Sequence, residues 1–165
     1  MTDKRYNILF LCTGNSARSI LAEGLMTHLG AKLGFHAFSA GSHPKGSVHP
    51  LAMKVLADHH IPTDGFRSKS WDEFAGPQAP VMDFIVTVCD AAAAEACPVW
   101  PGQPITAHWG LADPAAVDGP EALQQRAFLD AFVTMQRRIQ LMLSLPRVSL
   151  ERLVLQGQVK QIGQQ

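Results

Sequence analysis

The chain has 165 residues and a mass of 17.9 kDa, which predicts a single domain with a substantial core. Its 14 Lys and Arg residues balance its 14 Asp and Glu residues, and 47% of all residues are hydrophobic. This composition argues against non-specific nucleic-acid binding, which needs a basic surface, and against a disordered chain. No apolar run approaches the roughly 18 residues that span a membrane, and Ile8–Cys12 is too short for a signal peptide. We expect a cytoplasmic protein that binds neither nucleic acid nor membranes.

The three cysteines, Cys12, Cys89 and Cys97, are an odd number, which argues against a secreted domain built on disulfides. In a reducing compartment, such thiols are small buried residues, metal ligands or reactive groups. Their number does not separate these roles, so the neighbouring residues have to decide.

The first half of the chain alternates predicted strands with predicted helices. Tyr6–Leu11 is a nearly unbroken apolar run, typical of a strand buried on both faces of a parallel sheet. A polar loop over residues 13–17 follows, and apolar residues at helical spacing then predict a helix over about Arg18–Leu29. A short strand fits Phe35–Ser39. A helix fits Pro50–His59, where proline suits the first helical position because its missing N–H costs nothing there.

The second half continues this alternation. Met82–Val88 predicts another central strand, Ala91–Ala96 favours a helix by propensity, and Ile105–Trp109 fits a fourth strand. One apolar stripe along Glu121–Leu143 predicts a long amphipathic helix, and the signal weakens after Pro146. Alternating strands and helices indicate a parallel α/β sheet. Because ligands of such sheets bind beyond the carboxyl ends of the strands, the loop after the first strand is the candidate site.

That loop combines a nucleophile with the elements of an oxyanion site; it reads Cys12-Thr13-Gly14-Asn15-Ser16-Ala17-Arg18-Ser19. Its successive backbone N–H groups can curl around a tetrahedral oxyanion, and the following helix adds its positive end. Arg18 can hold two oxygens in a fork. The same dipoles stabilise the Cys12 thiolate, and Ser19 could add a hydrogen bond to the sulfur. A glycine turn can contain Cys and Arg by chance, but the position between strand and helix favours the functional interpretation.

The loop resembles the signature loop of the low-molecular-weight protein tyrosine phosphatase superfamily, particularly its thioredoxin-coupled arsenate reductase branch. The resemblance runs from about Tyr6 to Pro146 and includes these further segments: Ala22-Glu23-Gly24, Ser39-Ala40-Gly41, Val88-Cys89-Asp90, and His108-Trp109-Gly110 leading to Asp113-Pro114. It implies a single α/β domain over residues 1–146, with a four-stranded parallel sheet flanked by helices on both faces. Residues 147–165 are then a partly helical C-terminal extension.

Asp113 is the candidate general acid, because an oxygen expelled from the oxyanion leaves more easily when it is protonated. By itself, Asp113-Pro114 is only a turn dipeptide, and the acid role is implied by the resemblance. Ala115 and Ala116 follow, where tyrosine phosphatases of the superfamily usually place aromatic residues. A shallow site of this kind suits a small inorganic oxyanion better than phosphotyrosine.

Cys89 and Cys97 distinguish the two branches of the superfamily. By themselves they could be packing residues or metal ligands, although their spacing is a poor fit to structural zinc. The arsenate reductases that this chain resembles carry two further cysteines in this region, whereas plain phosphatases do not need them. The resemblance thus implies that Cys12 attacks arsenate, Cys89 attacks Cys12 as arsenite leaves, and Cys97 attacks Cys89. An external dithiol, thioredoxin or a glutaredoxin-type reductant, would reopen the final disulfide, and no bound cofactor is needed.

This relay places a geometric demand on the segment between the two cysteines. Eight residues of continuous helix rise about 12 Å, whereas a disulfide needs its Cα atoms within roughly 7 Å. We therefore expect Ala91–Ala96 to unwind in the oxidised state and to carry Cys97 outward.

The chain departs from the family pattern at two positions. Ala17 stands where many relatives have another cysteine, a loss that should spare catalysis. Some relatives bind potassium beneath the loop through residues matching Asn15, Glu23 and Ser39, but their fourth ligand, a carboxylate, aligns with Lys69 here. The Lys69 ammonium could take the ion's place, or Lys69 could be an ordinary surface lysine. We predict no bound metal, and a loop-shaping role for Asn15.

The leading hypothesis from the sequence is thiol-dependent reduction of arsenate to arsenite. The alternative is a low-molecular-weight phosphatase that acts on phosphotyrosine or small phosphate esters. A third reading, an inactive oxyanion sensor, is disfavoured because a binding protein needs neither Cys12 as nucleophile nor Asp113 as acid.

Overall fold

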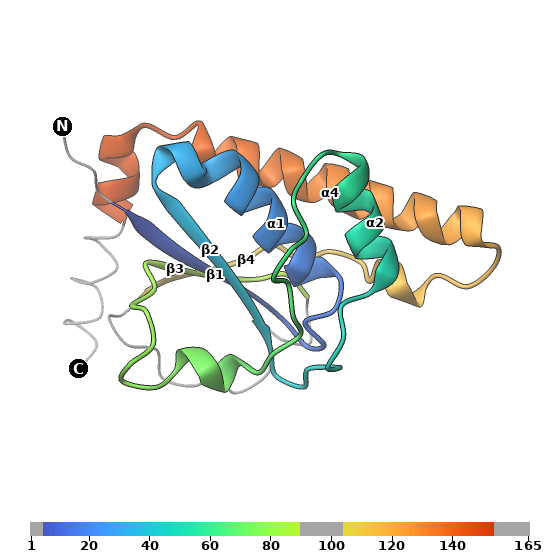
Figure 1. Ribbon diagram of the computed structural model, residues 1–165. Coiled ribbons are helices and arrows are strands. Elements are labelled where there is room, and N and C mark those ends of the chain that lie inside the picture. Colours follow the sequence, from blue (N-terminus) through green and yellow to red (C-terminus); the bar gives the residue numbers. More distant parts are fainter. Residues whose placement is uncertain (1–4, 90–103, 154–165) are drawn as a thin grey trace.

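A parallel sheet of four strands forms the centre of the protein (Figure 1). The computed structural model describes residues 5–89 and 104–153. The strands are β1 (Tyr6–Cys12), β2 (Phe35–Gly41), β3 (Phe84–Thr87) and β4 (Ile105–His108). They lie in the order β2-β1-β3-β4, so β1 is paired on both edges. The predicted single α/β domain with a four-stranded parallel sheet is confirmed.

Helical segments flank the sheet on both faces. The α-helices are α1 (Arg18–Gly30), α2 (Pro50–Asp58) and α4 (Glu121–Leu143), and the short 3₁₀ helices are η1 (Ala31–Leu33), η2 (Trp71–Phe74) and η3 (Pro114–Ala116). Figure 1 shows α1 and α4 side by side on one face, with η2 on the other. Residues 147–153 are also helical, and Leu150 packs into the core there.

The central strand β1 has buried side chains on both faces, as its apolar sequence predicts. Ile8 and Phe10 belong to the larger core cluster, which includes residues from α1, α2 and α4. Leu9 and Leu11 point the other way, because successive side chains of a strand alternate, and they belong to the cluster that contains Trp71. Because β1 lies between β2 and β3, the loop that follows it lies at the middle of the sheet's carboxyl edge.

The observed strands differ from the predicted ones at several of their ends. The strand expected over Met82–Val88 is only Phe84–Thr87, because the Asp83 carboxylate accepts the Asn7 N–H in place of a backbone carbonyl. The strand expected to end at Ser39 continues to Gly41, which pairs with Cys12. A Cβ at Gly41 would lie 2.4 Å from the Thr13 carbonyl oxygen, so glycine allows β2 to approach the loop this closely.

The predicted helices agree well with the observed ones. The helix expected over Glu121–Leu143 is α4, and the helix expected over Pro50–His59 is α2, which ends one residue earlier. His49 caps α2 by accepting the Leu51 N–H, with Pro50 at the first turn. The segment Ala91–Ala96 and most of the C-terminal extension lie outside the described residues, so their expected structure stays a prediction.

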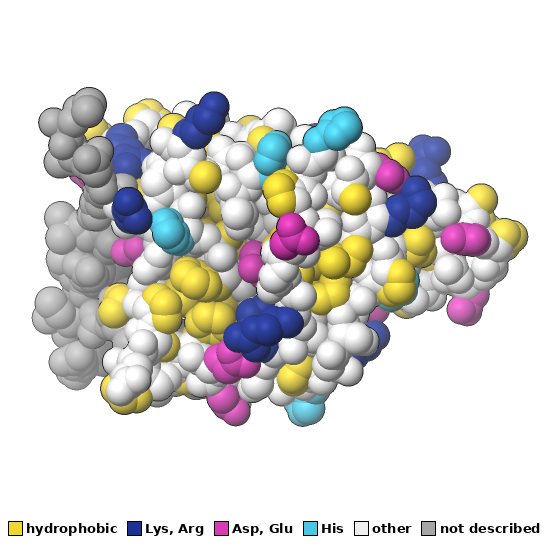
Figure 2. Space-filling view, viewed as in Figure 1, with side chains coloured by type: hydrophobic (Ala, Val, Ile, Leu, Met, Phe, Trp, Pro, Cys, Tyr) yellow, Lys and Arg dark blue, Asp and Glu magenta, His cyan; other side chains and the backbone are white. Residues whose placement is uncertain are grey.

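The surface charges mirror the balanced composition. On the face seen in Figure 2, Lys and Arg side chains are interspersed with Asp and Glu side chains. Among the described residues, no helix has the length and apolar character needed to cross a membrane.

Candidate active site

The loop between β1 and α1 is held in place through its carbonyl groups. The carbonyls of Thr13, Gly14 and Ser16 accept backbone N–H groups from the β2–α2 connection, each at 2.9 Å. In the part of the chain that the structure describes, no acceptor is recorded for the backbone N–H groups of Gly14, Ser16, Ala17 and Arg18. The outward carbonyls and unused N–H groups are the arrangement that an oxyanion requires.

The loop lines a cavity of about 240 Å³. Its walls are the loop residues Cys12 to Arg18 together with His43, Lys45, Asp113 and Ala115. Such a volume suits a small ligand. The cavity has two cationic side chains, Arg18 and Lys45, near its single carboxylate, Asp113. Its chemistry therefore favours an anion.

The Cys12 sulfur, on a residue only 3% exposed, accepts two hydrogen bonds. The Asn15 N–H lies 3.2 Å from the sulfur, and the Ser19 hydroxyl oxygen lies 2.9 Å from it, the contact that the sequence predicts. Because the Asn15 side-chain amide donates to the Ser19 oxygen at 2.8 Å, the Ser19 hydrogen is available to the sulfur. The Asn15 N–H and the Ser19 hydroxyl are therefore both directed at the sulfur.

Asn15 has the loop-shaping position that its sequence context predicts. It is fully buried and has a positive φ of 44°. Asparagine tolerates this left-handed conformation better than most residues. Its side chain spans the site from Ser19 to Ser39, and its oxygen accepts the Lys69 N–H at 2.9 Å.

Arg18 and Asp113 both line the cavity and form an ion pair with each other. The Arg18 guanidinium is 3.8 Å from the Asp113 carboxylate and donates to the Leu111 carbonyl at 2.8 Å. The other Asp113 oxygen accepts the Ala115 N–H at 3.0 Å, which caps η3 and fixes the carboxyl group. Arg18 thus links the oxyanion loop to the loop that carries the candidate acid.

Cys89 lies beside the loop, next to the residue that follows Cys12. The Cys89 sulfur is 3.6 Å from the Thr13 hydroxyl, and Cys89 is only 2% exposed. The pairing of β3 with β1 explains this position, because the Val88 N–H donates to the Leu11 carbonyl at the ends of the two strands. Cys97, the third candidate, lies outside the described residues.

His43 and Lys45 are cavity residues that the sequence analysis missed. Both come from the connection after β2, at the same carboxyl edge as the loop after β1. The rule that ligands bind at this edge could have identified them. His49 follows in the same connection. Burial lowers the pKa of its imidazole, the Lys45 charge lowers it further, and the Asp113 carboxylate opposes both effects.

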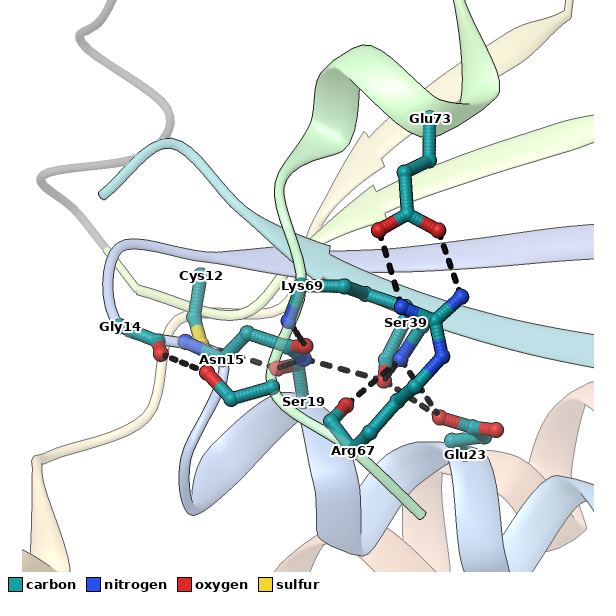
Figure 3. A network of polar contacts seen from close by, with 10 residues as sticks. Cys12, Gly14, Asn15, Ser19, Glu23, Ser39, Arg67, Lys69 and Glu73 are labelled. Carbon is teal, nitrogen blue, oxygen red and sulfur yellow. Dashed lines mark hydrogen bonds and ion pairs between the residues drawn. The ribbon is translucent and has the colours of Figure 1, made fainter. Parts of the chain in front are cut away.

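The residues suggested as a potassium site do not fit a cation, because Lys69 fills the position beside them. Its ammonium nitrogen is 3.4 Å from the Ser39 hydroxyl and 3.8 Å from the Glu23 carboxylate (Figure 3). Lys69 is only 8% exposed, so the alternative of an ordinary surface lysine is wrong. An added monovalent cation would lie next to an ammonium group, which Coulomb repulsion disfavours. Within the described ranges, no group of three or more His, Cys, Asp or Glu side chains forms a metal site either.

Burial acts on both members of the Glu23–Lys69 pair. It raises the pKa of the Glu23 carboxyl, against the hydrogen bond from Ser39 and the nearby Lys69 charge. It lowers the pKa of the Lys69 ammonium, against the Glu23 charge. Each charge therefore depends on the other to remain in this buried position.

A cysteine and an arginine lie at the two ends of a loop with unused N–H groups, on a parallel α/β sheet, an arrangement that can bind an oxyanion beside a thiol. The sequence profile of the low molecular weight phosphotyrosine protein phosphatase family matches residues 7–144. The chain belongs to this family.

The curated relatives include bacterial arsenate reductases. The chain is 37% identical over 115 residues to an arsenate reductase of Halalkalibacterium halodurans, a match that covers 69% of this chain and 78% of the relative. It is 35% identical over 131 residues to arsenate reductase 1 of Staphylococcus epidermidis, covering 79% and 94%. Among solved structures, an arsenate reductase in the phosphate binding state superimposes with a TM-score of 0.65, 23% identity, and coverage of 84% and 97%. That likeness supports the fold, and the sequence matches make the chain an enzyme of the arsenate reductase and low-molecular-weight phosphatase family.

Proposed function

We propose that this enzyme reduces arsenate to arsenite through its thiols. The observation that carries the proposal is the position of Cys89, whose sulfur lies 3.6 Å from the Thr13 hydroxyl at the edge of the oxyanion loop. A phosphate ester is hydrolysed by a nucleophile and an acid alone, so a second thiol beside the nucleophile favours a redox reaction. The matches to bacterial arsenate reductases support the same substrate.

The first step forms a bond between the Cys12 sulfur and arsenic. The loop N–H groups and Arg18 bind arsenate, the Cys12 thiolate attacks the arsenic, and one oxygen leaves as water. Asp113 supplies a proton to that oxygen, and Arg18 is close enough to position both the anion and the acid. Among the described residues, Ala115 forms the pocket wall after Asp113, and its small side chain suits a small anion.

The second step transfers two electrons to arsenic. The Cys89 thiolate attacks the Cys12 sulfur, a Cys12–Cys89 disulfide forms, the sulfur–arsenic bond breaks, and arsenic(V) leaves as arsenite. Cys97 then attacks Cys89, which frees the Cys12 thiolate and leaves a Cys89–Cys97 disulfide. An external dithiol, thioredoxin or a glutaredoxin-type reductant, restores the two thiols, and the cytoplasm is the compartment that supplies it.

Disulfide mapping tests this relay. The reduced protein is incubated with arsenate, without reductant, and its disulfides are identified by mass spectrometry. We expect a Cys89–Cys97 bond in the wild type and a trapped Cys12–Cys89 bond in Cys97→Ser, since the third thiol is then missing. Incubation with phosphate is the control, because phosphate occupies the same loop but accepts no electrons from thiols.

A different outcome would favour another function. The family match supports a phosphatase that acts on phosphotyrosine or small phosphate esters as the second candidate. Turnover of an aryl phosphate, with no disulfide formed by arsenate, would identify that activity as the principal one. Phosphate binding without either reaction would leave an oxyanion sensor.

A further inference from the structure

Lys69 lies in a segment that crosses beneath the oxyanion loop. Its carbonyl accepts the Gly41 N–H at 2.9 Å, and Ser70 forms a β-bridge with Gly41, so the segment extends the edge formed by β2. The hydroxyl of the preceding residue, Ser68, donates a hydrogen bond to the Gly14 carbonyl at 3.1 Å. The segment is therefore attached both to the sheet and to the loop, in a position where the Lys69 side chain is buried.

The Lys69 ammonium has two hydrogen-bond acceptors and one counter-charge among the described residues. It donates to the Arg67 carbonyl at 2.9 Å and to the Ser39 hydroxyl at 3.4 Å, and Glu23 provides the opposite charge at 3.8 Å. The Ser39 hydroxyl donates its hydrogen bond to the Glu23 carboxylate, so the Ser39 oxygen can accept a hydrogen bond from the Lys69 ammonium. The Arg67 side chain forms an exposed ion pair with Glu73, which helps to fix the residue whose carbonyl accepts from Lys69.

A chain of hydrogen bonds connects Lys69 with the sulfur of Cys12 (Figure 3). The Lys69 N–H fixes the Asn15 oxygen, which orients the amide so that its NH₂ group donates to Ser19 and Ser39. Ser19 in turn directs its hydrogen to the sulfur. The backbone N–H at position 69 is therefore connected to the nucleophile through Asn15 and Ser19, and the ammonium joins the same network through the Ser39 hydroxyl.

Charge provides a second connection. Burial lowers the pKa of the Lys69 ammonium, and the charges of Glu23, Glu73 and, least of all, Cys12 act in the opposite direction, so the ammonium and a thiolate at Cys12 attract each other. The other charged groups around Lys69 are Glu23, Arg67 and Glu73. Arg67 and Glu73 form an exposed pair with each other, which leaves Glu23 as the main counter-charge of the buried ammonium.

We propose that Lys69 is a positioning residue for Cys12, an internal cation that contacts Ser39 and Glu23 in place of a bound metal ion. Its backbone fixes the Asn15–Ser19 hydrogen bonds, and its charge favours the thiolate. This inference rests on Cys12 as the nucleophile of the proposed function, but it holds for any oxyanion substrate.

The test measures the pH at which Cys12 becomes reactive. Alkylation of Cys12 by iodoacetamide is followed from pH 5 to 10, with peptide mass spectrometry to separate it from the other cysteines. In Lys69→Met, which removes the charge at similar length, we expect the midpoint to rise by about one pH unit. The matched control is Lys54→Met, which removes an exposed lysine paired with Asp58 on α2, and its midpoint should equal that of the wild type. An unchanged midpoint in Lys69→Met would overturn the proposal.

A second pair of variants keeps the test valid if Lys69→Met does not fold. Folding could fail in that variant because the buried Glu23 carboxylate loses its counter-charge. Glu23→Gln and the double variant Glu23→Gln with Lys69→Met differ only in the lysine, and the double variant contains neither charge. We expect the double variant to have the higher midpoint, and equal midpoints would contradict an effect of Lys69. A response of the wild type to potassium chloride in place of choline chloride, at equal ionic strength, would also contradict it. None of these measurements uses arsenate, so their failure would not be confused with failure of the proposed function.

Discussion

Ser19 connects the buried polar network with the candidate nucleophile. Its oxygen accepts from the Asn15 amide and its hydroxyl lies 2.9 Å from the Cys12 sulfur. A hydrogen bond to a charged group contributes about 1.5–3 kcal/mol, which is more than a neutral one. Ser19→Ala should therefore raise the pH midpoint of Cys12 alkylation by roughly one unit.

The control for this prediction is Ser144→Ala, because the Ser144 hydroxyl only donates to the Leu141 carbonyl at the exposed end of α4. Phosphate affinity, measured by calorimetry, should decline less than thiolate reactivity, since Ser19 contacts the sulfur. A normal alkylation profile in Ser19→Ala would show that the Asn15 N–H alone stabilises the thiolate.

Single residues also show what the sequence could predict at this scale. The contact between Ser19 and Cys12 was predicted, because Cys12 ends the first strand and Ser19 lies at the start of the helix that follows the loop. The burial of Lys69 did not, because a lysine in a polar segment carries no periodic signal. Its position depends on the pairing of residues 69–70 with Gly41, a contact between distant parts of the chain.

At the scale of elements, α4 supports the candidate acid loop from behind. The Arg138 guanidinium donates to the Trp109 carbonyl at 2.9 Å and to the Gly110 carbonyl at 3.0 Å. These bonds hold the connection between β4 and Asp113. Arg138→Met should loosen that connection and lower kcat about tenfold, with a smaller change in phosphate affinity, because the oxyanion loop itself is untouched.

Arg137→Met is the matched control, since Arg137 is its exposed neighbour on the same helix. Steady-state kinetics with an aryl phosphate and with arsenate would measure the effect. Equal losses in both variants would indicate a general effect on α4, and an unchanged kcat in Arg138→Met would show that the loop does not need this support.

Elements with a strong pattern were predicted nearly to the residue. The apolar stripe of α4 and the unbroken apolar run of β1 leave little choice of structure. The start of β3 was placed too early because the Asp83 side chain replaces a backbone partner, and a hydrophobic pattern does not reveal such a replacement.

At the scale of the whole molecule, the cavity combines three connections that lie far apart in the sequence. They are the loop after β1, the connection after β2 that contains Lys45, and the connection after β4 that contains Asp113. Phosphate should therefore stabilise the complete fold. At roughly 100 times its Kd, it should raise the free energy of unfolding by about 2.7 kcal/mol.

Thermal unfolding with increasing phosphate measures this linkage. Arg18→Met should lose most of the stabilisation, because the Arg18 guanidinium lines the cavity and contacts the connection that carries Asp113. Arg126→Met, at an exposed pair with Asp130, should keep it. Equal stabilisation of all three proteins would mean that phosphate binds elsewhere.

The assembly of these connections was predictable only in part. The carboxyl edge of a parallel sheet indicated the loop after β1, and the resemblance added Asp113 and Cys89. The same edge rule also indicates the connection after β2, but its short polar sequence does not show that His43 and Lys45 fold back over the neighbouring loop.

Recognition through main-chain N–H groups has an evolutionary consequence. Every amino acid except proline carries this donor, so the side chains of Thr13, Ser16 and Ala17 can drift without removing it. Ala17 still has to be small, since it is only 6% exposed. We expect selection to act mainly on Cys12, on Arg18 and on the left-handed conformation at Asn15. Descendant genes can therefore diverge within the loop while the ancestral chemistry is inherited.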